Sequence, residues 1–233
     1  MISRRTTELP ADRATVLHTD VLFGVTVSVL LLLVVRHHYE PFLARGYLVW
    51  NLFLAWIPYV CARAIWRAGR ASSPLPLLLP LLGVWLVFLP NAPYLVTDVV
   101  HMHRYAHGLA LVLEVALFGT VALAGILLGV ASIQPIHRIV AERYGSLAAR
   151  AFPPLIAVAS AFGVYLGRVQ RWNSWALIQT PGQLLHATWN VLGHPIAHPR
   201  AFGGIALFSL AFLLVYRVLT AERGVLGGLH RQS

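Results

Sequence analysis

The stretch from Phe88 to His107, FLPNAPYLVTDVVHMHRYAH, gathers side chains that can bind a metal, donate a hydrogen bond or titrate. Asp98 and His101 stand three residues apart, a spacing that places a carboxylate and an imidazole on one face of a helix. Such a pair can share a divalent metal ion, or the carboxylate can orient the imidazole for acid–base catalysis. The spacing is common, so an ordinary polar pair is the alternative. His103 stands four residues before His107, but solvation in a polar loop explains both better than metal binding.

A second acid, Glu114, lies inside an apolar segment and would complete a catalytic set with Asp98 and His101. An acidic side chain within a membrane-spanning segment is costly and usually faces a partner or water. The candidate partners of Glu114 are Arg168, His101 and Asn51, and the alternative to a role in a site is a plain structural ion pair. If a metal is the cofactor, Asp98 and His101 are its predicted ligands.

A cationic motif, GRVQRWNSW over residues 167–175, follows another apolar segment. Arg168 and Arg171 are three residues apart, so a helix would present both on one face, where they suit a phosphate or another anion. Snorkelling of the two side chains to the membrane surface is the alternative, and the two tryptophans match an aromatic belt. The predicted ligand-binding residues are Asn51, Asn91, Tyr94, Thr97, Arg168, Arg171, Trp172, Asn173 and Ser174.

The composition shows which elements must position these residues. Of the 233 residues, 58% are hydrophobic and 11% are charged, and the mean hydropathy is +0.70. A soluble domain carries about 25% charged residues, so the chain is predicted to cross a membrane several times. The net charge of +10 comes from arginines scattered at helix ends, which argues against nucleic acid as a partner. The single Cys61 excludes a disulfide framework.

Windows of about 20 apolar residues predict an all-α bundle of about six transmembrane helices. The predicted spans are residues 16–35, 47–66, 75–96, 109–131, 151–169 and 201–219. They form one domain over residues 16–219, between tails of residues 1–15 and 220–233. With the N-terminus inside, twelve of the 18 arginines fall in inner segments and six in outer ones, which predicts that both tails are cytoplasmic. The basic residues are all arginine, as in GC-rich coding, so we expect a bacterial plasma (inner) membrane.

The third predicted span is interrupted by prolines. Pro90 and Pro93 each remove a backbone donor, so the chain around Asn91 and Ala92 is predicted to be irregular while still within the membrane. Irregular backbone is tolerated there only if it is buried in protein or lines a wet cavity. The alternative is a helix that ends early and tilts. Thr97 is then predicted to cap a short helix that carries the DxxH pair.

Two further features concern packing and the membrane surface. The spacing Gly125-x-x-x-Gly129, repeated at residues 163–167, predicts close helix packing. Thr180 as N-cap, followed by proline, and Gly193 as terminator frame a helix of about a dozen residues. This helix is too short to span and is expected to lie in the interface, where it either covers a site or only anchors the chain.

Four segments of the chain resemble one known family. They are WNLFLAWIP (50–58), WLVFLPNAPYLVTDVVH (85–101), the IHR around His137, and YLGRVQRWNSW (165–175). Over about residues 47–177 the chain is similar to the domain of unknown function 1361 family of uncharacterised bacterial multi-pass membrane proteins. The resemblance implies a membrane location and no established activity. In the family pattern an Asp follows RWNSW, whereas this chain has Ala176, so a metal site would lack one ligand.

In the predicted topology the polar motifs converge on the outer face of the membrane. We therefore expect one outward-opening cavity lined by Asn51, Asn91, Asp98, His101, Glu114, Arg168 and Arg171. An anionic lipid headgroup or a lipid-linked substrate would suit it. Three classes of function remain open: an enzyme acting on such a substrate, a binding or transport protein, and a structural subunit of a membrane complex. No internal repeat is present, which disfavours a transporter built from inverted repeats.

Overall fold

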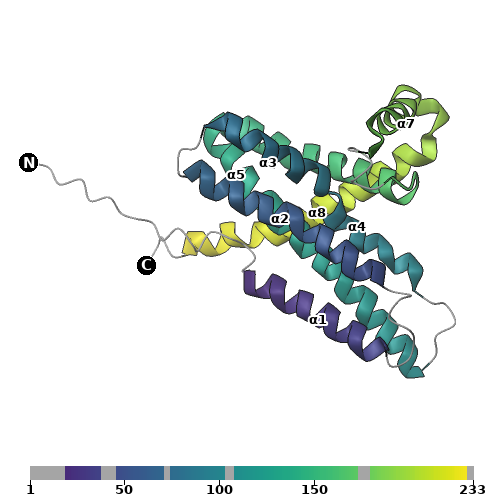
Figure 1. The fold of residues 1–233 in the computed structure, drawn as a ribbon. Helices are drawn as coiled ribbons and strands as arrows, with labels where there is room; N and C mark the ends of the chain where they lie inside the picture. The colour runs from purple at the N-terminus through teal and green to yellow at the C-terminus, as the bar shows by residue number, and fades with distance from the viewer. Residues whose placement is uncertain (1–18, 38–45, 71–73, 103–107, 173–178, 230–233) are drawn as a thin grey trace, which may run out of the picture.

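The computed structural model describes residues 19–37, 46–70, 74–102, 108–172 and 179–229. All secondary structure in these ranges is helical, which confirms the predicted all-α bundle (Figure 1). The elements are α1 (Thr19–His37), α2 (Gly46–Arg70), α3 (Leu75–Phe88), α4 (Asn91–Thr97), the 3-10 helix η2 (Asp98–His101), α5 (Gly108–Arg168), α7 (Pro181–Gly193), the 3-10 helix η3 (Pro195–Ala197) and α8 (Pro199–Leu229).

Five helical stretches of the described residues are long and apolar enough to cross a membrane. They are Thr19–His37, Gly46–Gly69, Pro76–His101, Gly108–Arg168 and Pro199–Thr220. This is one fewer than the predicted count of about six. The difference arises because the fourth and fifth predicted spans both lie in the 61-residue α5. Gly145 interrupts this helix with φ +80° and ψ −173°, a conformation that residues with a Cβ rarely adopt. An imidazole nitrogen of His137, before that point, lies 2.9 Å from the carbonyl oxygen of Ala149 after it. The chain therefore reverses there, and α5 consists of two arms.

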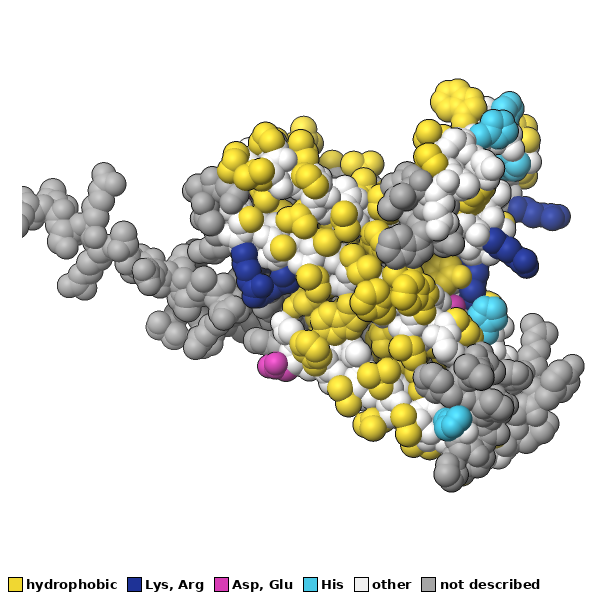
Figure 2. Space-filling view, viewed as in Figure 1, with side chains coloured by type: hydrophobic (Ala, Val, Ile, Leu, Met, Phe, Trp, Pro, Cys, Tyr) yellow, Lys and Arg dark blue, Asp and Glu magenta, His cyan; other side chains and the backbone are white. Residues whose placement is uncertain are grey.

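The outside of the bundle is apolar over a broad band. Figure 2 shows hydrophobic side chains over the visible middle of the bundle, with arginine side chains toward both ends and histidine side chains toward one. Leu31, Leu207 and Leu214 are among the large side chains that leave more than half of their surface exposed. Such exposure is typical of side chains that face lipid, because a soluble protein rarely leaves so continuous an apolar surface in water. These features are those of a membrane helix bundle.

The short helix α4 is packed closely against both arms of α5. A Cβ on Gly125, in the first arm, would lie 2.7 Å from Cβ of Leu95 and nearer still to the carbonyl oxygen of Ala92. A Cβ on Gly163, in the second arm, would lie 2.7 Å from Cβ of Pro90. Only glycine permits these approaches, which confirms the close packing predicted from the glycine spacing. The helix that leads into the DxxH pair is thus held from two sides.

The interruption of the third span differs in place from its prediction. The break falls at Leu89 and Pro90, whereas Asn91 and Ala92, predicted to be irregular, are the first residues of α4. Even at the break the backbone stays in the right-handed helical region, with φ −52° at Leu89 and φ −59° at Pro90. The Asn91 side-chain amide donates to the carbonyl oxygen of Phe88 at 2.9 Å. This hydrogen bond satisfies a carbonyl oxygen near the end of α3, in the turn that Pro90 disturbs.

Candidate functional site

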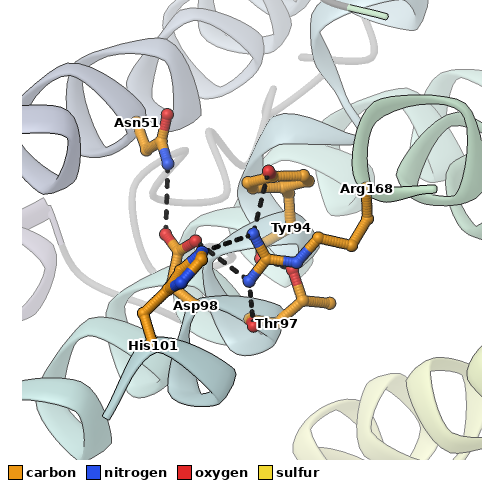
Figure 3. Close-up of polar contacts among 6 residues, drawn as sticks. All are labelled: Asn51, Tyr94, Thr97, Asp98, His101 and Arg168. Carbon is orange, nitrogen blue, oxygen red and sulfur yellow. Dashed lines mark hydrogen bonds and ion pairs between the residues drawn. The ribbon is translucent and has the colours of Figure 1, made fainter. Parts of the chain in front are cut away.

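Asp98 lies at the start of η2 and is only 1% exposed. The side-chain amide of Asn51, on α2, donates to its Oδ2 at 3.1 Å. Its other oxygen, Oδ1, lies 3.4 Å from a guanidinium nitrogen of Arg168 but has no hydrogen-bond partner among the described residues. Figure 3 shows this carboxylate between the amide on one side and the guanidinium on the other. The site therefore joins α2, η2 and the end of α5.

Arg168, the last residue of α5, holds four polar groups of the α4–η2 segment through its guanidinium. One terminal nitrogen donates to the Tyr94 hydroxyl at 3.2 Å and lies 3.0 Å from Nε2 of His101. The other donates to the carbonyl oxygen of Thr97 and forms the ion pair with Asp98. The Tyr94 ring also lies beneath the guanidinium, 5.1 Å from its carbon to the ring centroid. Such a planar group with several fixed donors suits this cluster better than an ammonium would.

His101 lies directly beside a fixed positive charge. A terminal nitrogen of the Arg168 guanidinium, which can only donate, lies 3.0 Å from its Nε2. The same guanidinium contacts both predicted metal ligands, so a positive charge already stands beside Asp98 and His101. The residues that the structure describes contain no group of three or more His, Cys, Asp and Glu side chains placed to hold a metal ion. The arrangement thus favours an ion pair over the metal site that the sequence predicted.

A cavity of about 700 Å³ opens beside this cluster. Seven of the predicted site residues line it: Asn51, Asn91, Tyr94, His101, Arg168, Arg171 and Trp172. Asp98 lies behind the wall and reaches the cavity through Asn51 and Arg168, and Thr97 contributes its carbonyl to Arg168. Asp98 and Arg168 therefore share one site, as the sequence predicted. Asn173 and Ser174 lie outside the described residues, as do His103, His107 and Ala176.

Arg171 has an unusual backbone conformation. Its φ is +60°, and it is the non-glycine residue with positive φ in the described part of the chain. The N–H of Trp172 returns to the carbonyl oxygen of Leu166 at 3.0 Å, which closes the end of α5. Glycine usually occupies such a left-handed position after a helix, and another residue there costs about 1–2 kcal/mol. Because α5 ends at Arg168, the two arginines do not share a helical face, although both line the cavity.

Glu114 is placed differently from its prediction. Its Oε1 accepts from Arg36, with Nη2 at 2.9 Å and Nε at 3.3 Å, and the two side chains are 0% and 4% exposed. Neither residue is among those that line the cavity. Glu114 therefore joins α1 to α5 in an ion pair, and the partners predicted for it, Arg168 among them, were wrong. The signal was present, because Arg36 follows directly on the first predicted span and needs an acid when that helix is packed.

The apolar part of the cavity was not predicted. Trp50, Leu54, Val87, Leu166 and Leu184 line it together with the polar residues. These five residues look like ordinary membrane or core residues, and the polar motifs of the sequence do not point to them. The adjacency of Trp50 to Asn51 is the signal that could have indicated one of them.

The fold and the cavity together define a class: an all-helical, multi-pass membrane protein with a cavity that both polar and apolar side chains line. The chain belongs to the family described as Protein of unknown function (DUF1361), whose family model matches residues 50–215. The match includes α7 and extends into α8, beyond the resemblance expected from the sequence motifs, and it leaves α1 outside. The comparisons found no similar curated protein and no similar solved structure.

Proposed function

We propose that the cavity binds the anionic headgroup of a lipid or lipid-linked molecule. The observation that carries this proposal is the charge of the wall. The Arg168 guanidinium is paired with the Asp98 carboxylate, so this pair adds little net charge to the wall. Arg171 has no acidic partner among the described residues and lines the same cavity in a strained conformation. Strained backbone is retained where surrounding structure or function requires it, and a cation in a cavity wall attracts an anion.

The apolar part of the cavity supports a lipid over a free ion. Trp50, with 51% of its surface exposed, and Leu54 stand on α2 beside Asn51. Leu166 and Leu184 contribute further apolar surface from α5 and α7. A site with a few polar groups in a mainly apolar wall matches a ligand that has a charged head and a hydrocarbon chain.

The site is proposed to face outward from a bacterial plasma membrane. The support is the distribution of arginines, twelve in predicted inner segments and six in outer ones. A cysteine replacing Gln183 should react with an impermeant thiol reagent added outside intact cells, and one replacing Arg143 should not. Both positions are exposed, whereas the native Cys61 is buried. The reverse labelling pattern would contradict this orientation.

The geometry favours binding over acid–base catalysis. Asp98 is buried behind the wall, and one of its oxygens already accepts from Asn51. Glu114 is paired with Arg36 away from the cavity. Of the three residues predicted to be catalytic, His101 alone lines the cavity, and its Nε2 already contacts a guanidinium nitrogen of Arg168.

A titration in neutral detergent tests the proposal. Short-chain phosphatidylglycerol should bind the purified protein saturably, and phosphatidylcholine should bind at least about tenfold more weakly, the equivalent of about 1.4 kcal/mol. Arg171→Gln should lose the phosphatidylglycerol affinity by a similar factor. Arg200→Gln is the matched control, because Arg200 is an exposed arginine near the start of α8 that does not line the cavity. Equal affinity in Arg171→Gln and the wild type would overturn the proposal.

A further inference from the structure

The helix α7 and the short η3 carry an exposed apolar surface that the proposed headgroup site does not use. Leu185, Trp189 and Leu192 are 66%, 73% and 50% exposed, and Ile196 on η3 is 95% exposed. The spacing of four and three residues places the three α7 side chains in one stripe. In Figure 1, α7 stands apart from the long helices, on the side away from the end of α8.

The helix has three distinct faces. Val191 is 1% exposed and Leu184 lines the cavity, so these two residues, seven apart, form a face that protein covers. Gln183, His186 and Asn190, again three and four apart, are polar and exposed. The apolar stripe with Trp189 lies between these two faces. A helix with separate apolar and polar exposed faces is typical of one that lies at a membrane surface.

The position of α7 between two candidate membrane spans indicates that lipid covers the stripe. The candidate span that ends at Arg168 and the one that begins at Pro199 flank the segment, so it leaves and re-enters the same side of the bundle. With 13 residues, α7 is about 20 Å long, too short to cross a hydrocarbon core of about 30 Å. Its residues, PGQLLHATWNVLG, include no Asp, Glu, Lys or Arg. An apolar, uncharged stripe held at the membrane boundary fits the bilayer itself.

We infer that α7 and η3 lie in the lipid interface, with Leu185, Trp189, Leu192 and Ile196 at the boundary of the acyl chains. The face with Leu184 lines the cavity, so α7 forms a wall between the cavity and the surrounding lipid. Because the stripe is uncharged, its insertion depends on apolar burial and is the same in neutral and anionic bilayers. The inference stands apart from headgroup binding, since neither the stripe nor its contact with lipid requires Arg171.

Fluorescence quenching in phosphatidylcholine proteoliposomes tests the inference. The difference in emission between the wild type and Trp189→Phe gives the signal of Trp189. Lipid brominated at the upper acyl carbons should remove roughly half or more of that signal, and aqueous iodide should remove little of it, as for a side chain at the acyl boundary. Adding phosphatidylglycerol to the vesicles should not change either result.

A matched variant moves the probe to the polar face. The double variant Trp189→Phe, Asn190→Trp should reverse the pattern, with quenching by iodide and little quenching by the brominated lipid. If Trp189 is quenched by iodide and not by brominated lipid, the stripe faces water and the inference is wrong. If neither reagent quenches it, protein covers the stripe, and the inference is equally wrong. Both outcomes leave the phosphatidylglycerol titration unaffected, so the two proposals fail separately.

Discussion

The protein contains two ion pairs between an arginine and a carboxylate that have very different surroundings. Arg36 and Glu114 lie 2.9 Å apart and are 4% and 0% exposed, so packing closes this pair from all sides. Arg168 and Asp98 lie 3.4 Å apart, and Arg168 keeps 21% of its side chain exposed at a cavity wall. An intramembrane charge is costly in either setting. The comparison shows that pairing alone does not mark a site.

The neighbours of each pair explain the difference. Around Glu114, Leu117 and Phe118 belong to the buried core that also contains Leu33 of α1. The closed pair thus fastens α1, which lies outside the family match, to the body of the protein. Around Arg168 the neighbours are polar groups of the segment after the proline break, held by the glycine contacts of α5. The closed pair thus has the surroundings of a structural ion pair, and the open pair has those of the binding site that we propose.

Removing the acid of the closed pair should have the largest effect on stability. Glu114→Gln takes away the counter-charge that Arg36 contacts, and breaking a buried pair costs about 3–5 kcal/mol. Thermal unfolding in detergent measures the loss. Glu142→Gln, an exposed acid on the same helix, is the control and should change little. The double variant Arg36→Met, Glu114→Leu should recover most of the stability, and failure to recover would show that the pair does more than pack.

Replacing the cation of the open pair should reduce stability and binding together. Arg168→Lys keeps the charge, but a compact ammonium cannot reach Tyr94, His101 and the Thr97 carbonyl at once. The expected loss of stability is about 1.5–3 kcal/mol, the value of hydrogen bonds to a charged group. Unfolding and phosphatidylglycerol titration of the same preparation measure both effects. A lysine variant with the stability and affinity of the wild type would remove the distinction between the pairs.

Removing the side-chain amide that donates to Asp98 should have an intermediate effect on stability. Asn51→Ala leaves Oδ2 of Asp98 buried without its donor, which costs about 1–3 kcal/mol. Asn190→Ala provides a control, because that asparagine is exposed on α7. Thermal unfolding of the two variants side by side gives the comparison. A loss no greater than that of the control would mean that water or Arg168 replaces the amide.

The smallest expected change in stability has an opposite sign. Arg171→Gly relieves a left-handed conformation that costs about 1–2 kcal/mol, against about 0.4–1 kcal/mol for the freer unfolded chain. The variant should therefore be more stable by less than about 1 kcal/mol, while its affinity for phosphatidylglycerol falls. Arg171→Ala loses the charge without relieving the backbone and should lose affinity with no gain in stability. If both variants retain the affinity for phosphatidylglycerol, Arg171 has no role in binding.

Local patterns in the sequence predicted much of the fold. Apolar windows located the spanning helices, and the Thr180, proline and Gly193 signals predicted α7 within its observed bounds. The break in the third span was misplaced because proline is tolerated in the first turn of a helix, where Pro93 lies. Thr97 occupies the predicted N-cap position of the short helix that carries His101, but its side chain does not cap it. Its backbone is helical, with φ −76° and ψ −13°, and its hydroxyl donates back to the Tyr94 carbonyl.

The pairing of charges could not be predicted in the same way. Glu114 and Arg36 are 78 residues apart in the chain, and their contact depends on how α1 packs against α5. Six arginines fall on the outer side in the predicted topology, and local spacing cannot choose among them. Convergence of Asn51, Asp98 and Arg168 was predictable because topology brings their helix ends to one side. The apolar wall was not, since its residues look like any others in a membrane protein.

Native mass spectrometry shows directly whether the cavity beside the open pair retains an anionic headgroup. Protein released from vesicles that contain equal amounts of phosphatidylglycerol and phosphatidylcholine is weighed with the lipid it retains. We expect preferential retention of phosphatidylglycerol by the wild type and by Arg200→Gln, and loss of that preference in Arg171→Gln. Retention of phosphatidylglycerol by Arg171→Gln at the level of the wild type would contradict it.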